Sequence, residues 1–274
     1  MTLLPRLFSP LRACLRGAVP LLTMFLLTGV QAAPVATEKA TTSGNTQPKG
    51  ISFYVLRVIY PEGEKKGVTL TAYNKTDRPY LMQSRIRPVD SVTGNVDMSD
   101  KGEAAQSMPF IVTPPLARLE ANGELTLRIR RSSEALPLDR ESVFFVSMKA
   151  IPPQAPEAHG GDTQQMVLTV VSNLKVFYRP EGLNKRALVD TDVASKLRFR
   201  REGNRLIADN PTPYWLTFSR LTVGRTSLDK AQLRLMVPPF GKQTYSLPAA
   251  ATGSVTWQLI DEDGWDTPIQ QRSL

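Results

Sequence analysis

Hydrophobic and polar residues alternate with a period of two in short runs from residue 51 to near the C-terminus. The first run, Ile51–Tyr60 (ISFYVLRVIY), is rich in β-branched and aromatic residues and ends in the turn sequence PEGEKKG. Comparable runs follow at 68–74, 80–89, 109–131, 143–153 and 166–180. The only helical candidate is a weak one, Lys185–Leu197. Because short strands separated by turn residues are typical of β-sandwiches, the pattern predicts an all-β fold.

A break in the pattern near Arg179–Leu183 (RPEGL) divides the chain. Proline and glycine end a strand there, and strand-and-turn patterns begin again after residue 197. We therefore predict an N-terminal sandwich over residues 51–180 and a smaller sandwich over residues 181–274, joined by a short connector. A polar segment, Asp90–Ser107, interrupts the strands of the first sandwich.

The first 32 residues have the pattern of a secretory signal peptide. Arg6, Arg12 and Arg16 precede the apolar run Ala18–Val30, which leads into small residues. The apolar run is shorter than the roughly 20 residues that span a bilayer. We expect cleavage after Ala32, because Pro34 disfavours cleavage one residue later. Residues 33–50 are mostly small or polar and are predicted to be a flexible lead-in. The mature protein is therefore expected to be exported and soluble.

Side chains for metal or thiol chemistry are scarce. The only cysteine, Cys14, lies in the signal segment, and the only histidine, His159, lies in a turn-rich loop. The sequence therefore predicts no disulfide, no metal site, no cofactor and no Cys/His or Ser/His catalysis. The formal net charge is +9, or 9 − 3 = +6 without the signal arginines, but the basic residues are dispersed. Thr126, Arg128 and Arg130 alternate with apolar residues, which predicts a solvated face rather than nucleic-acid binding.

Two cations interrupt apolar runs at positions where a strand would bury them. Lys175 lies within NLKVFYRP and Arg57 lies within YVLRVIY. Charged residues are seldom fully buried unless they are paired, and no acidic residue occurs from Gln164 to Pro180. One interpretation is an internal ion pair with a distant acid. The other is that both cations converge on one external anion, because arginine offers a planar fork to a carboxylate and lysine a point charge beside it.

The run Met166–Val171 (MVLTVV) is largely apolar on both alternating faces. Met166, Leu168 and Val170 form one face. A central strand buried on both sides is one interpretation, but such strands belong to sheets covered by helices, and this chain has almost none. The other interpretation is an edge strand, which would promote aggregation unless a partner covered it. We favour an edge strand that a partner covers.

Motifs along most of the chain occur in a recognisable order. In the first predicted sandwich they are RVIYPEG (57–63), FIVTPPL (110–116), LPLDRESVFF (136–145), MKAIP (148–152) and KVFYRP (175–180). In the second they are DNPTPYWLTF (209–218), MVPPFG (236–241) and VTWQLIDEDG (255–264). Together they resemble the periplasmic chaperones of chaperone–usher pili. The resemblance implies two immunoglobulin-like sandwich domains set at an angle with a cleft between them, in a periplasmic protein that is not an enzyme.

The resemblance also implies a site and its partners. The two cleft cations of the family match Arg57 and Lys175, which would bind the C-terminal carboxylate of a pilus subunit. Its alternating apolar residues on the last strand of the first domain match Met166, Leu168 and Val170, which would enter the groove of a subunit that lacks its own final strand. The chaperone would deliver the subunit to an outer-membrane usher. The sequence leaves open whether the free chaperone self-associates through the same edge strand.

Other functions fit the sequence less well. A fimbrial structural subunit or adhesin would need an N-terminal donor strand of alternating apolar residues, whereas residues 36–50 are mainly polar. A periplasmic hydrolase would need a histidine base within a strand. We further interpret Asp139–Glu141 as a structural ion pair, Trp215, Trp257 and Trp265 as packing residues of the second sandwich, and the acidic turn Asp261–Asp263 as solvated.

Overall fold

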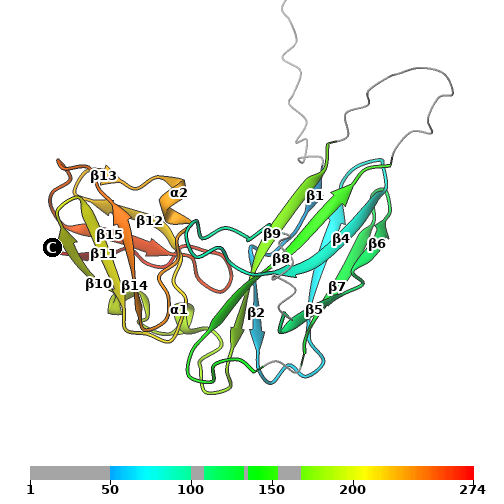
Figure 1. The fold of residues 1–274 in the computed structure, drawn as a ribbon, viewed down its shortest axis with the longest axis horizontal. Helices are drawn as coiled ribbons and strands as arrows, with labels where there is room; N and C mark the ends of the chain where they lie inside the picture. Colours follow the sequence, from blue (N-terminus) through cyan, green and yellow to red (C-terminus); the bar gives the residue numbers. More distant parts are fainter. Residues whose placement is uncertain (1–49, 100–107, 133–134, 154–167) are drawn as a thin grey trace, which may run out of the picture. The chain divides into compact units, whose positions relative to one another are not determined.

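The computed structural model describes residues 50–99, 108–132, 135–153 and 168–274, which form two β-sandwiches (Figure 1). Met166, the lone histidine and the predicted signal segment lie outside these residues. Strands predominate, and the helical segments are single short turns, so the predicted all-β fold is confirmed. In this part of the chain no helix is long and apolar enough to cross a membrane.

The first sandwich consists of a four-stranded sheet and a five-stranded sheet. The order in the smaller sheet is β1 (Ile51–Ser52), β3 (Val68–Asn74), β7 (Glu124–Arg131) and β5 (Phe110–Thr113). The order in the larger sheet is β2 (Arg57–Pro61), β9 (Val170–Arg179), β8 (Ser142–Ile151), β4 (Tyr80–Arg87) and β6 (Leu116–Leu119). Within this sandwich β2 and β9 pair in parallel, and the other pairs are antiparallel.

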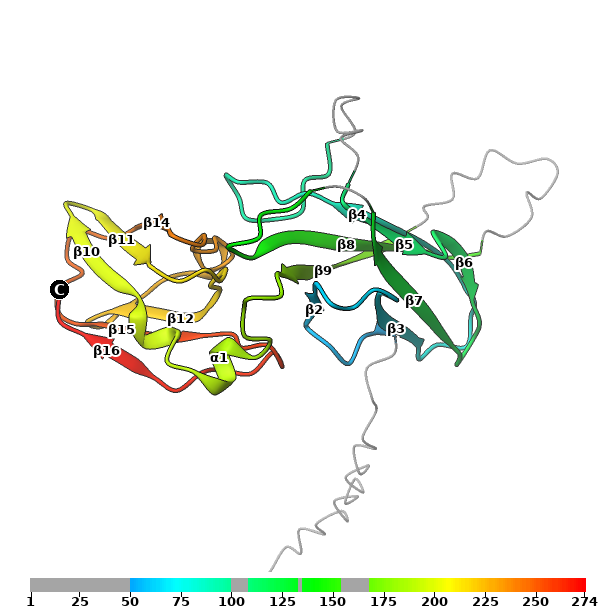
Figure 2. The same ribbon diagram turned by 90° about the horizontal axis from the view of Figure 1, so that it is seen from below.

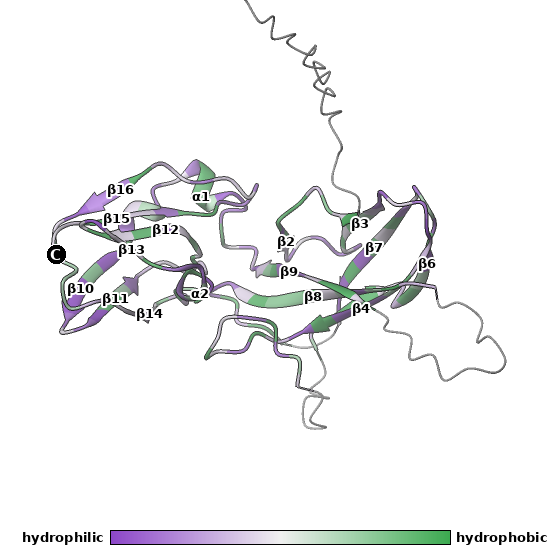
Figure 3. Ribbon diagram, turned by 90° about the horizontal axis from the view of Figure 1, so that it is seen from above, coloured by the Kyte–Doolittle hydropathy of each residue, from purple (hydrophilic) through white to green (hydrophobic). Residues whose placement is uncertain are grey.

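The period of two sorts side chains between core and solvent. Hydrophobic and hydrophilic segments alternate along strands such as β4 and β7 (Figure 3). In β7, Leu127 and Ile129 are fully buried, whereas Arg128 and Arg130 are exposed. The predicted solvated face of this basic run is therefore confirmed.

Aromatic side chains hold β2 and β9 against the opposite sheet. The rings of Tyr60, Phe110 and Tyr178 are neighbours, with centroids 5.0 to 6.3 Å apart. All three are almost completely buried. Because burial of one large apolar side chain contributes about 2–3 kcal/mol, this cluster fixes the position of β2 beside β9.

The second sandwich has a three-stranded and a four-stranded sheet. The order in the three-stranded sheet is β10 (Arg198–Glu202), β11 (Arg205–Asn210) and β14 (Gly241–Ser246). The order in the four-stranded sheet is β13 (Thr226–Ser227), β12 (Phe218–Val223), β15 (Val255–Leu259) and β16 (Gln270–Arg272). The helical turns are α1 (Ala187–Asp190), η1 (Ala194–Lys196) and α2 (Lys230–Leu233). The helical candidate Lys185–Leu197 is thus two short turns, because Thr191 returns to an extended backbone conformation.

The three tryptophans have different environments. Trp257 is 1% exposed at the centre of the second core, and its indole N–H donates to the Ala194 carbonyl oxygen at 3.0 Å. Trp215 instead bonds to a residue of the first sandwich, described below. Trp265 lies in a turn, but its side chain is 74% exposed. The predicted packing role holds for Trp257 and is wrong for Trp265.

Candidate functional site

The two cations singled out in the sequence are direct neighbours across a pair of parallel strands. Arg57 opens β2, and its register partner in β9 is Lys175. The next residues of both strands, Val58 and Val176, are buried in the first core. Because side chains alternate between the two faces of a sheet, Arg57 and Lys175 project together from the face opposite this core.

Arg57 is only 9% exposed and incompletely hydrogen-bonded. Its Nη1 donates to the Ile260 carbonyl oxygen of the second sandwich at 2.8 Å. Its guanidinium carbon lies 5.1 Å from the centroid of the Phe177 ring. Its Nε is buried and has no hydrogen-bond partner among the residues that the structure describes. Burial lowers the pKa of Arg57 to about 10. Only one of the five guanidinium N–H donors is thus hydrogen-bonded within the described part of the chain, so the side chain retains donors for an external acceptor.

Lys175 is partly buried beside Arg57. Burial, and to a smaller extent the charge of Arg57, lower the pKa of its ammonium group to about 8. No acid among the described residues forms an ion pair with Lys175 or Arg57. Two like charges held side by side and shielded from water form a site for an anion.

The nearby acids are engaged by a third cation, Arg179 at the end of β9. Its Nε and Nη2 donate to Glu141 at 2.8 and 2.5 Å, and its Nη1 donates to Glu262 at 2.9 Å. The three side chains are 4% exposed or less. Burial alone would lower the pKa of Arg179, but the two carboxylates outweigh it and the pKa is raised. The internal ion-pair interpretation thus applies to Arg179, and not to Arg57 or Lys175.

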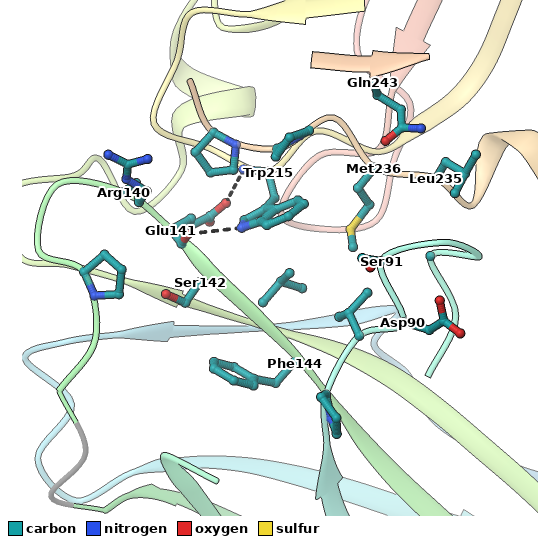
Figure 4. Close-up of a pocket in the computed structure, with 17 residues that line it drawn as sticks. Asp90, Ser91, Arg140, Glu141, Ser142, Phe144, Trp215, Leu235, Met236 and Gln243 are labelled. Carbon is teal, nitrogen blue, oxygen red and sulfur yellow. Dashed lines mark hydrogen bonds between the residues drawn. The ribbon is translucent and has the colours of Figure 1, made fainter. Parts of the chain in front are cut away.

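This cluster corrects two sequence interpretations. Glu262 is buried and accepts the Leu188 backbone N–H at 3.1 Å, so the prediction of a wholly solvated acidic turn is wrong. Asp139 and Arg140 do form an exposed ion pair at 2.7 Å, but Glu141 points elsewhere. Its carboxylate accepts the Trp215 backbone N–H at 2.8 Å, and its own carbonyl accepts the Trp215 indole N–H at 3.1 Å (Figure 4).

Sequence reasoning missed Arg179 and Glu262 as a pair. They are separated by 83 residues, and no local pattern links them. The available signal was weak: Arg179 ends an apolar run, just before a proline, and Glu262 lies in a turn where exposure is the usual outcome.

A cavity of about 610 Å³ lies beside Glu141 and Trp215, lined mainly by apolar side chains (Figure 4).

The N-terminal half of β9 has an open edge. Figures 1 and 2 show β9 between β8 and β2. Strand β8 pairs with β9 from Val170 to Tyr178, whereas β2 pairs only from Lys175 to Arg179. Residues 170–174 therefore have no strand beside them, among the residues described, on the side where β2 would continue. The cations stand where this open edge ends.

The predicted apolar face of this strand is confirmed as exposed where the structure describes it. Leu168 is 77% exposed and Val170 is 60% exposed. Val170 lies on the same face of β9 as Val176 and Tyr178, which are buried in the first core. Leu168 precedes the strand, and Met166 lies outside the described residues. The face of β9 that contributes to the first core therefore continues toward the N-terminus as an exposed apolar ridge, formed by Leu168 and Val170.

Together these features are suited to one kind of ligand. The open edge offers backbone groups to an extended chain, and the cation pair offers charge-assisted hydrogen bonds at one end of that edge. A carboxylate at the end of an extended chain meets both requirements.

Comparison with known proteins gives a consistent result. The N-terminal domain described as "Pili and flagellar-assembly chaperone, PapD" matches residues 50–184, and the C-terminal domain described as "Pili assembly chaperone PapD" matches residues 192–271. The chain is 37% identical over 220 residues to Chaperone protein FimC of Escherichia coli K12, covering 80% of this chain and 82% of that protein.

Solved structures are similar over most of the chain. A chain of the Salmonella enterica SafA pilin in complex with the SafB chaperone is 31% identical, with a TM-score of 0.68 over 84% of this chain and 98% of that one. The periplasmic chaperone SfaE is 34% identical, with a TM-score of 0.60 over 81% of this chain and 98% of that one.

Proposed function

The chain belongs to the pili assembly chaperone family, and from this premise we propose that it binds folding pilus subunits through the open edge of β9 and the cation pair Arg57–Lys175. The single observation that carries the proposal is a neighbouring pair of cations, Arg57 buried and Lys175 partly buried, that form no salt bridge with any described acid and lie at the end of an unpaired strand edge. The family is one of chaperones rather than enzymes.

The C-terminal carboxylate of the subunit is the anion that completes the cation pair. Arginine binds a carboxylate through paired N–H donors, and among the described residues only one guanidinium donor of Arg57, on Nη1, is already hydrogen-bonded. Lys175 adds a second charge beside it. Because both cations are desolvated before the subunit arrives, little further desolvation of the chaperone opposes binding, and the interaction is strong for a single ion pair.

The position of β2 sets the direction of the bound subunit strand. A bound strand whose C-terminal carboxylate lies at Arg57 lies beside residues 170–174 of β9. It occupies the line that β2 would follow if β2 continued toward its N-terminus. It therefore runs parallel to β9, as β2 does. Main-chain hydrogen bonds along this edge provide affinity independent of sequence, as in other cases of β-strand addition.

Apolar side chains from β9 and its N-terminal extension then replace part of the subunit's own core. Leu168 and Val170 are exposed on the face that continues the first core, and the period of two places Met166 on the same face. Each buried side chain of this kind contributes about 1.5–3 kcal/mol. A subunit that lacks its final strand is the partner that such a ridge fits.

Export and delivery complete the proposal. Residues 1–32 act as a signal peptide and direct the chain to the periplasm, where it transfers subunits to an outer-membrane usher. A role as a structural subunit or adhesin is not favoured, because the relatives and structural neighbours are chaperones.

Co-expression with candidate subunits tests the proposal. Arg57→Ala and Lys175→Ala should each reduce recovery of the chaperone–subunit complex, because losing one partner of a desolvated charge pair costs about 2–5 kcal/mol. Arg220→Ala is the matched control, since Arg220 is an exposed cation on a strand of the second sandwich. Circular dichroism checks that each variant remains folded. Recovery by both site variants at the control level would refute the carboxylate anchor.

A further inference from the structure

A short hairpin follows β4 and reaches the second sandwich (Figure 1). It spans residues 88–97, which include the start of the polar segment noted in the sequence, and it is called the 88–97 hairpin below. Val89 and Val96 form an antiparallel bridge, and the Asp90 backbone N–H donates to the Asn95 carbonyl oxygen at 2.8 Å. The hairpin is therefore a folded unit with its own backbone hydrogen bonds.

The Asp90 side chain holds the turn of this hairpin. Its Oδ1 accepts the backbone N–H of Val92 at 2.8 Å and that of Thr93 at 3.0 Å. Gly94 follows with a φ of +67°, in the left-handed region, and its N–H donates to the Asp90 carbonyl oxygen at 2.8 Å. Aspartate commonly forms such bonds at the start of a turn, and glycine adopts a positive φ without steric strain. The turn thus holds Gly94 at its tip.

Gly94 is buried, although the neighbouring residues of the turn are exposed. A Cβ atom on Gly94 would lie 2.6 Å from the Arg234 carbonyl oxygen and 3.1 Å from the Leu235 Cα atom. Both partners directly follow α2 in the second sandwich. The first of these distances is too short for a real Cβ atom, so a side chain at this position requires the backbone to shift. Backbone packs against backbone here, and the tip of the hairpin rests on the second sandwich.

The two sandwiches do not fill the space between their contacts. The cavity of about 610 Å³ described above is lined by the 88–97 hairpin, the start of β8 and the segment after α2 (Figure 4). Contacts that join the sandwiches surround it: the hairpin tip, the bonds between Glu141 and Trp215, and the Arg140 guanidinium, 5.2 Å from the centroid of the Phe240 ring. Protein interiors seldom leave a void of this size. The angle between the sandwiches therefore depends on the contacts around the cavity.

We propose that the 88–97 hairpin is a brace that fixes the angle between the two sandwiches and thereby positions Arg57 for the terminal carboxylate of a bound chain. This inference rests on the proposed function, because it takes that carboxylate as the ligand. Arg57 Nη1 donates to the Ile260 carbonyl oxygen of the second sandwich, so the orientation of the guanidinium depends on the angle. Gly94 and Asp90 are positioning residues, which act on Arg57 through the second sandwich.

The hairpin restrains a motion that the other contacts leave free. Two domains joined by a short connector move relative to each other unless further contacts hold them. Arg57 and Arg179 both bind the segment 260–262 of the second sandwich, and contacts at one segment permit rotation about it. The hairpin binds a different segment, 234–235. Contacts at two separate segments oppose this rotation, which is how a brace works.

Distances between spin labels test the brace in the full mature chain. The only cysteine lies in the predicted signal segment, so Thr126→Cys on β7 and Thr244→Cys on β14 provide one exposed label on each sandwich. Double electron–electron resonance gives the distribution of distances. Gly94→Ala should broaden this distribution by about twofold, because the added methyl group displaces the hairpin from the Arg234 carbonyl and frees the hinge.

Matched variants separate the brace from backbone strain. Gly203 lies in the turn between β10 and β11 and has a similar φ of +56°, but no described atom lies within 4 Å of its Cβ position. Gly203→Ala therefore adds similar strain without a clash and should leave the distribution unchanged. Asp90→Ala removes the acceptor that holds the turn and should broaden the distribution. Asp90→Asn keeps an acceptor oxygen and should not. Circular dichroism checks that each variant is folded.

The same variants test the effect on the site. The probe is a synthetic peptide of about ten residues with alternating apolar side chains, prepared as a free acid and as an amide. Fluorescence anisotropy gives the dissociation constants, and the wild type should prefer the acid. Gly94→Ala and Asp90→Ala should lower this preference about fivefold, as expected if about one fifth of the molecules keep Arg57 in place. Gly203→Ala and Asp90→Asn should retain the full preference.

The outcomes separate this inference from the proposed function. No acid preference in the wild type overturns both. An acid preference that Gly94→Ala and Asp90→Ala leave intact overturns the brace and leaves the carboxylate site in place. The brace is also overturned if Gly94→Ala broadens the distance distribution no more than Gly203→Ala does. Should Gly94→Ala fail to fold, the comparison of Asp90→Ala with Asp90→Asn decides by the same two measurements.

Discussion

Replacing Lys175 with methionine is expected to stabilise the free chaperone while weakening its binding to pilus subunits. Methionine keeps the length and much of the volume of the side chain and removes the charge. In the free protein that charge is partly buried beside Arg57, and no described carboxylate forms a salt bridge with it. The same charge is unfavourable before a subunit binds and favourable afterwards.

The size of the effect follows from the titration of Lys175. Burial lowers its pKa from 10.5 to about 8, and at about 1.4 kcal/mol per pKa unit the charged form is disfavoured in the folded protein by about 3 kcal/mol at pH 7. A lysine with a lowered pKa binds its proton more weakly in the folded state, so the unfolded state holds more protons between pH 8 and pH 10.5 and stability rises with pH in that window. The free-energy cost of the Lys175 charge to the folded state is about 1.4 kcal/mol at pH 9.5.

Urea unfolding followed by tryptophan fluorescence measures the effect. The mature Lys175→Met protein should exceed the wild type in unfolding free energy by about 3 kcal/mol at pH 7, and by about 2 kcal/mol less at pH 9.5. Lys149→Met, at an exposed position on the neighbouring strand β8, is the control and should change stability by no more than about 0.5 kcal/mol.

The pH dependence is the decisive part of this test. Methionine also adds apolar contacts, but their contribution does not change between pH 7 and pH 9.5. A variant that is no more stable than the wild type at pH 7 would contradict the reasoning. A stability difference that stays constant with pH would do the same, because it could not come from the charge.

Three further predictions follow from the site. The dissociation constant of the subunit complex should rise about 30-fold from pH 7 to pH 9.5 if the bound carboxylate restores the ordinary pKa of Lys175, and titration calorimetry should show no such rise with Lys175→Met. Leu168→Glu should abolish subunit capture, because a charge would enter the subunit core, and normal co-purification would disprove strand donation. Glu262→Ala should destabilise the protein by about 2–3 kcal/mol, because the buried donors of Arg179 and Leu188 would lose an acceptor, and unchanged urea midpoints would count against that view.

Local sequence patterns were enough to predict the fold class and to single out the residues of the proposed site. Short runs with a period of two require strands, since only a sheet sorts such a pattern between core and solvent. Arg57 and Lys175 stood out because a charge inside an apolar run needs a partner, and Leu168 and Val170 because a strand apolar on both faces needs a cover. These are local properties, and local sequence contains them.

Which charges become neighbours depends on the tertiary fold. The parallel register of β2 and β9 makes Arg57 and Lys175 neighbours, although 118 positions separate them along the chain. The acids that could have neutralised them pair with Arg179 instead, and Glu262 is buried although its turn predicted exposure. The start of β2 at Arg57 leaves the edge of β9 open. Each of these outcomes depends on contacts between distant segments, and the packing of the two sandwiches, not any local pattern, brings those segments together.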